Sequence, residues 1–102
     1  MALDFYDVTD CDREKKLFSL LQKDYLQVSQ IFEMFEQRTG VFVDPYGTTR
    51  LYSNNIGLLV ELIGRCLSEE VCKNVDFELI KRLQMFLSNA FQKGHTLIIE
   101  GD

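Results

Sequence analysis

Few residues in this chain could take part in nucleophilic catalysis. There is one histidine, His95, and there are three cysteines, Cys11, Cys66 and Cys72. A Cys–His pair can act as nucleophile and base, so Cys66 or Cys72 could in principle work with His95. No local signature of a cysteine nucleophile accompanies them, and His95 follows a predicted helix, whose dipole favours a cation at that end. We therefore expect His95 to lie at a helix terminus and Cys66 to lie in the core.

Metal binding and acid–base catalysis by carboxylates have equally little support. Zinc sites need cysteines and histidines at close spacing, and neither a Cys-x-x-Cys pair nor a histidine pair occurs. Glu33 and Glu36 share one face of a predicted helix, a spacing that a solvated helix face also explains. No glycine-rich phosphate loop, nucleophile elbow or dinucleotide fingerprint is present. We therefore expect no cofactor, no metal and no enzymatic activity.

The length and composition indicate one globular domain over residues 1–102. Hydrophobic residues make up 46% of the chain and aromatic residues 12%, which is enough for a single core. The formal net charge of −5 opposes direct binding to nucleic acid and attracts a basic partner. We see no apolar run of membrane-spanning length, no secretion signal and no pattern of paired cysteines. These features predict a cytoplasmic protein.

Hydrophobic periodicity predicts eight secondary-structure elements. In chain order they are a strand at 2–8, helices at 12–23 and 25–40, strands at 41–44 and 48–52, helices at 54–67 and 77–93, and a strand at 95–102. The order β-α-α-β-β-α-α-β predicts an α+β domain in which four helices pack on a small antiparallel sheet with a central β-hairpin. The two terminal strands are candidates for neighbours in that sheet.

Cap and glycine signals mark several helix boundaries. Asp76 is placed to cap the last helix, while Gly40 and Gly94 are placed to end helices in the left-handed conformation. Gly57 and Gly64 fall on one line of the helix at 54–67, which is apolar over more than half of its circumference. We expect this helix to be the central one and its two glycines to allow close packing.

Residues 39–53, TGVFVDPYGTTRLYS, hold a predicted turn at Asp-Pro-Tyr-Gly. Tyrosine and arginine are common at binding hot spots, so Tyr46 and Arg50 beside this turn could contact a partner. They could equally pack on the sheet and balance a neighbouring carboxylate. The candidate partner-binding residues, including acidic positions elsewhere, are Tyr46, Arg50, Asp4, Asp7, Glu33 and Glu36.

The run IFEMFEQRTGVFVDPYGTTRLYSNNIGLLVELI, residues 31–63, resembles small bacterial immunity proteins encoded beside polymorphic toxins, including those of contact-dependent growth inhibition. The likeness covers about a third of the chain; the remainder is similar only in size, acidity and α+β layout. The resemblance implies a cytosolic protein that binds one cognate toxin domain and blocks it without catalysis. Many such toxins are nucleases with basic clefts, which an acidic inhibitor would suit.

Two further functions are consistent with the sequence. The chain could be a regulatory or adaptor module, alone or as a weak dimer, that assembles through a hairpin edge or apolar helix faces. It could also be a small hydrolase or transferase that uses carboxylates, or Cys72 with His95. An open, charged pocket around those groups would favour the enzyme, and a closed core would oppose it.

Overall fold

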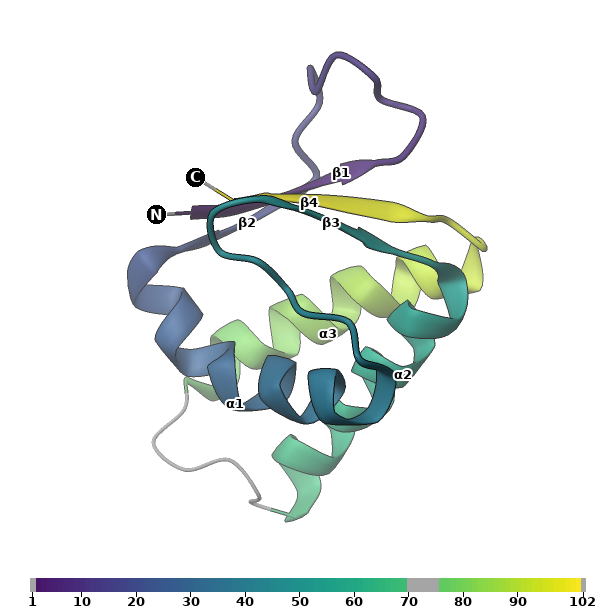
Figure 1. Cartoon of the computed structure of the whole chain (residues 1–102). Helices are drawn as coiled ribbons and strands as arrows, with labels where there is room; N and C mark the ends of the chain where they lie inside the picture. The colour runs from purple at the N-terminus through teal and green to yellow at the C-terminus, as the bar shows by residue number, and fades with distance from the viewer. Residues whose placement is uncertain (1, 70–75, 102) are drawn as a thin grey trace.

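The computed structural model describes residues 2–69 and 76–101. Within them the elements are β1 (Ala2–Asp7), β2 (Phe18–Leu21), α1 (Gln22–Thr39), β3 (Thr48–Leu51), α2 (Ser53–Glu69), α3 (Phe77–Gln92) and β4 (Leu97–Gly101). The strands form one antiparallel sheet in the order β2-β1-β4-β3. All three helices lie on one side of this sheet (Figure 1). The terminal strands β1 and β4 are the central neighbours, which confirms their predicted proximity.

The sheet has one apolar face and one polar face because side chains alternate along each strand. Leu3 and Phe5 of β1 are fully buried against the helices. Asp4 and Tyr6, which alternate with them, lie on the outer face. The other strands contribute Leu20, Leu51, Leu97 and Ile99 to the buried face.

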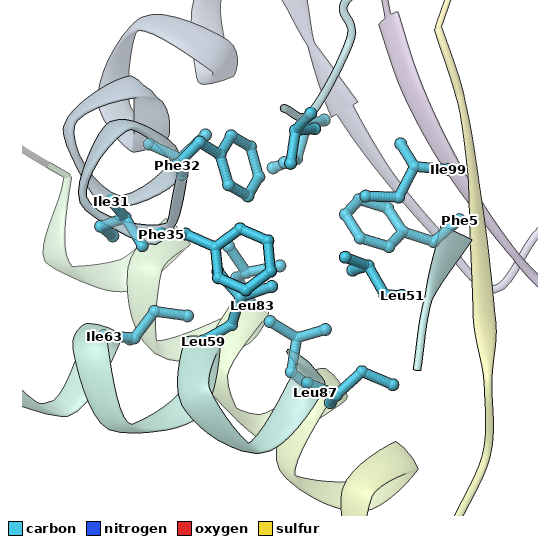
Figure 2. Packing of buried hydrophobic residues seen from close by; sticks show 14 of the residues in the cluster. Phe5, Ile31, Phe32, Phe35, Leu51, Leu59, Ile63, Leu83, Leu87 and Ile99 are labelled. Carbon is cyan, nitrogen blue, oxygen red and sulfur yellow. The ribbon is translucent and has the colours of Figure 1, made fainter. Parts of the chain in front are cut away.

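Helix α2 is the central helix, as its broad apolar surface predicts. It packs against both α1 and α3, and Leu59 and Ile63 on its inner side are fully buried. Helix α1 buries Val28, Ile31, Phe32 and Phe35, the spacing predicted for its apolar face. Figure 2 shows side chains from all three helices pointing toward those of the sheet, with Phe35 close to Leu59 and Leu83.

The prediction that both glycines of α2 allow close packing is confirmed at Gly57 only. An added Cβ at Gly57 would lie 2.7 Å from Cε1 of Phe91, so the bare backbone admits that ring from α3. At Gly64 the nearest atom would be Nε2 of Gln84, at an ordinary contact distance of 3.5 Å. Gly57 is therefore the position where the helix–helix contact requires glycine.

The prediction of four helices is wrong, because residues 12–23 do not form one. Phe18–Leu21 form β2, which pairs with β1 through partners such as Phe5↔Phe18 and Leu3↔Leu20. Phe18 and Leu20 pack on the core side, so the pattern that governs this segment has a period of two and not 3.6. The apolar residues at 17, 18 and 21 fit a helical face equally well, which is why the sequence misleads here.

The predicted central hairpin is also wrong. Residues 41–44 are not a strand, and β3 pairs with β4 at the edge of the sheet. The turn itself is present: the Gly47 N–H donates to the Asp44 carbonyl oxygen (3.5 Å), and the Tyr46 N–H donates to Asp44 Oδ1 (2.9 Å). The observed order is β-β-α-β-α-α-β.

The predicted helix boundaries are confirmed where a local interaction fixes them. Gly40 ends α1 with φ 75°, and Gly94 follows α3 with φ 69°. The Asp76 carboxylate accepts hydrogen bonds from the N–H groups of Glu78 and Leu79 at the start of α3. Helix α2 continues two residues beyond the predicted end at 67, to Glu69, and residues 70–75 are outside the described part of the chain.

The loop 8–17 between β1 and β2 lies on the outer side of the sheet, away from the helices (Figure 1). Arg13 in this loop adopts a left-handed φ of 55°. Its Nη1 donates to the Asp10 carbonyl oxygen (2.6 Å), and its Nε lies 3.3 Å from Glu100 Oε1 on β4. Its guanidinium also lies 5.9 Å from the centre of the Tyr6 ring. These contacts attach the loop to the polar face of the sheet.

Asp7, at the end of β1, is held by three neighbouring groups. Its Oδ1 accepts hydrogen bonds from the Thr9 hydroxyl (2.6 Å) and the Thr9 N–H (2.9 Å). Nδ1 of His95 lies 3.5 Å from its other oxygen. The two Thr9 hydrogen bonds, with a smaller contribution from His95, lower the pKa of Asp7 below its ordinary value of 3.8.

We expect Gly101→Ala to destabilise the fold. An added Cβ would overlap the main-chain carbonyl group of Pro45. The two backbone segments are already close, because the Gly101 N–H donates to the Gly47 carbonyl oxygen (2.7 Å). Overpacking against backbone costs about 1–3 kcal/mol. Gly64→Ala is the matched control and should raise stability by about 0.5–1 kcal/mol through helix propensity. Urea denaturation measures both, and an unchanged midpoint for Gly101→Ala would contradict the contact.

We expect Thr9→Val to change how stability depends on pH. Because the pKa of Asp7 is lowered in the folded state, its contribution is present above the unfolded-state pKa and is lost as the pH falls through the folded-state pKa. Removing the Thr9 hydroxyl should bring the folded-state pKa of Asp7 closer to its ordinary value. The difference in unfolding free energy between wild type and variant should therefore be larger at about pH 7 than at about pH 2.

An NMR titration of the Asp7 carboxyl carbon, with urea denaturation at both pH values, tests this directly. Thr9→Ser keeps the hydroxyl and should retain the wild-type titration. Identical titrations in the Val and Ser variants would show that the hydroxyl does not stabilise the carboxylate.

Candidate protein-docking groove

A groove of about 280 Å³ runs between α1 and residues 42–43. We call it the α1 groove and define it by Tyr25, Phe32, Glu33, Glu36, Phe42 and Val43. Its apolar part comes from both sides, whereas both of its carboxylates come from α1. The groove therefore combines aromatic surface with negative charge.

Helical spacing brings the α1 residues of the groove together. Tyr25, Phe32 and Glu36 recur at intervals of seven and four residues, so they follow one stripe of the helix. Phe32 is nearly buried and anchors the stripe to the core, and its ring lies 6.4 Å from that of Tyr25. Glu33 and Glu36 are exposed at the edge of the stripe.

Phe42 and Val43 form the opposite wall, and a buried threonine holds their segment in place. Thr49 of β3 is only 6% exposed; its Oγ1 accepts from the Asp44 N–H (3.1 Å) and donates to the Phe42 carbonyl oxygen (3.5 Å). Val43 is buried between these two attachment points. The side chain of Phe42 is left 54% exposed, on a segment fixed on both sides of it.

The carboxylates of Glu33 and Glu36 have no hydrogen-bond or ion-pair partner within residues 2–69 and 76–101. The other flank of α1 has the opposite charge. There, Arg38 and Arg65 line a separate hollow of about 220 Å³ between α1 and α2. Negative and positive charge are thus separated across one helix.

The candidate partner-binding residues do not form one surface. Glu33 and Glu36 meet in the α1 groove, and Tyr46 is 74% exposed at the nearby turn without lining the groove. Arg50 is exposed on β3, where it lies opposite Ile98 of β4. Asp7, at the sheet end, is bound by Thr9.

Asp4 lies on the outer face of the sheet, where its carboxylate is already engaged. It accepts from the Ser19 hydroxyl (2.7 Å) and lies 3.7 Å from Nζ of Lys16. The available carboxylates among the candidates are therefore those of Glu33 and Glu36.

Sequence reasoning missed the aromatic residues of the groove. Tyr25 extends the apolar stripe of α1 by one turn, a signal that was available in the spacing. Phe42 falls in the segment predicted as a strand, and that prediction does not show which of its side chains is exposed. In the structure Phe42 is exposed and its neighbour Val43 is buried. That difference in exposure depends on the hydrogen bonds of Thr49, which no local pattern reveals.

Of the candidates for cysteine–histidine chemistry, the structure describes Cys66 and His95 and does not describe Cys72. Cys66 is fully buried in the core, as predicted, and Cys72 lies outside the described residues. The charged neighbour of His95 in the described part is Asp7. Residues 2–69 and 76–101 contain no group of three His, Cys, Asp or Glu side chains able to hold a metal ion. They also contain no helix with the length and apolarity of a membrane span.

The chain was compared with protein-family models, with curated proteins and with solved structures, and none of them matched. No match therefore supports the likeness to immunity proteins expected for residues 31–63.

Proposed function

We propose that this protein acts by binding, and that it neutralises a basic protein partner by stoichiometric, non-catalytic occupation of the partner's surface. The observation that carries this proposal is the α1 groove, in which two carboxylates with no partner among the described residues lie beside the exposed ring of Phe42. The resemblance of residues 31–63 to immunity proteins suggests a bacterial toxin domain as the partner. The cytoplasm is then the compartment in which protection would be needed.

The groove has the character of an interface more than that of a reaction site. Aromatic residues supply large contact area with few torsions to freeze, and interface cores are enriched in them. A carboxylate that becomes desolvated on binding must find a cationic partner, which makes such a site selective. The net charge of −5 adds long-range attraction for a basic domain.

The adaptor hypothesis, with assembly through a sheet edge, receives less support. The edge strands β2 and β3 have four residues each, and β3 carries the exposed Arg50. Short edge strands and charged edge residues oppose strand-to-strand association.

Coexpression with the toxin domain encoded beside this gene tests the proposal. Cells should survive only when both proteins are made, and titration calorimetry should give a 1:1 complex. Cell death despite folded protein, or the absence of a complex, would contradict the proposed immunity function.

The interface itself is tested by the double variant Glu33→Gln, Glu36→Gln. We expect at least a tenfold loss of affinity for the toxin domain, which is about 1.4 kcal/mol. Association should also slow several-fold when salt is raised from about 50 to about 300 mM, while dissociation changes less. Stopped-flow kinetics measures both rates.

Glu14→Gln is the control for that variant, because it removes one negative charge from the exposed loop on the other side of the sheet. It should leave the dissociation rate unchanged. Equal losses from the control and the double variant would place binding outside the α1 groove.

A further inference from the structure

We infer that the α1 groove receives an arginine side chain from the partner, with the guanidinium held between the carboxylates of Glu33 and Glu36 and the exposed ring of Phe42. This inference rests on the proposed function only in taking the groove as the interface. It adds the chemical identity of the group that enters.

The two carboxylates make the α1 groove favourable for a cation. Glu33 and Glu36 are three residues apart on α1, a spacing that puts their Cβ atoms about 5–6 Å apart on one helix face. Like charges at this spacing destabilise a helix slightly, and no described cation offsets them. A guanidinium between them would supply donors to both carboxylates.

The aromatic walls favour arginine over lysine. A guanidinium is planar, more weakly hydrated than an ammonium, and stacks on an aromatic face while its edge donates hydrogen bonds. Phe42 and Tyr25 offer ring surface next to the carboxylates, and the arginine's methylene groups would cover apolar surface. Lysine would keep the charge but lose the stacking.

The size of the groove suits a single side chain. Its volume of about 280 Å³ is just below the range of about 300–1,000 Å³ typical of small-molecule sites. Its Phe42 wall is fixed by the two hydrogen bonds of Thr49, so little ordering is required when a side chain enters.

The charge on the other flank of α1 sets the orientation. Arg38 lines the hollow between α1 and α2 and its guanidinium disfavours a basic segment there, whereas Glu33 and Glu36 favour one on their side of α1. Of these two cavities beside α1, only the α1 groove suits a cation.

A short capped peptide, Gly-Gly-Arg-Gly-Gly, tests the inference without any toxin. NMR titration of the full chain should show saturable shifts at Tyr25, Glu33, Glu36 and Phe42, with a dissociation constant on the order of 1 mM. The same peptide with citrulline, which is nearly isosteric and uncharged, should bind at least tenfold more weakly. The lysine peptide should bind several-fold more weakly.

Variants separate charge from stacking. Glu33→Gln with Glu36→Gln should reduce arginine-peptide affinity at least tenfold, and Glu14→Gln should not change it. Phe42→Leu keeps apolar bulk but removes the ring face, and should bring the arginine and lysine peptides to similar affinity. Unchanged chemical shifts in the core would show that each variant is folded.

Equal binding of the arginine and citrulline peptides, or shifts that map outside the groove, would overturn the inference. If the peptide binds in the groove but the protein fails to protect cells, the immunity function fails and the guanidinium site stands. If the protein protects cells but the peptide does not bind in the groove, the immunity function stands and the guanidinium site is contradicted.

Discussion

A sheet that is covered by helices on one face only is the constraint on which this fold depends. Leu3, Phe5, Leu97 and Ile99 place a continuous apolar surface on one side of the strands, and that surface must be removed from water. Three helices are packed there, and the loop 8–17 lies on the other side. Function must therefore use the outer face of the sheet, the outer surfaces of the helices or the segments between elements.

The α1 groove shows how a minor polar interaction in the core shapes the surface. Thr49 sits among buried apolar side chains, yet its hydroxyl joins β3 to residues 42 and 44. A valine of the same shape would leave the Asp44 N–H without that acceptor, a cost of about 1–3 kcal/mol for a buried group. Thr49 belongs to β3, so the backbone that carries the Phe42 ring is held in place only when β3 is in the sheet. The second wall of the groove therefore depends on the sheet.

Local signals in the sequence were sufficient for the three helices that form and for several of their ends, but they also predicted a fourth helix at 12–23 that does not form. The spacing of Val28, Ile31 and Phe35, the cap at Asp76 and the left-handed Gly40 all depend on residues a few positions apart. The strands were harder, because their pairing joins distant segments. Residues 18–21 match a helical stripe until β1 lies beside them, and residues 41–44 look like a strand although β3 pairs with β4 instead. For the same reason, Glu33 and Glu36 could be named from sequence, whereas Phe42 opposite them could not.

The pairing of β1 with β4 has a consequence for the order of folding. Leu3 lies opposite Gly101, so the central ladder joins residues almost a hundred positions apart. During synthesis, β1 can meet β2 early, but β3 has no neighbouring strand until residues 97–101 have left the ribosome. The half-made chain then exposes the apolar side of an unfinished sheet, and such long-range closure makes folding slow. The central ladder can therefore close only after residues 97–101 are available to pair with β1 and β3.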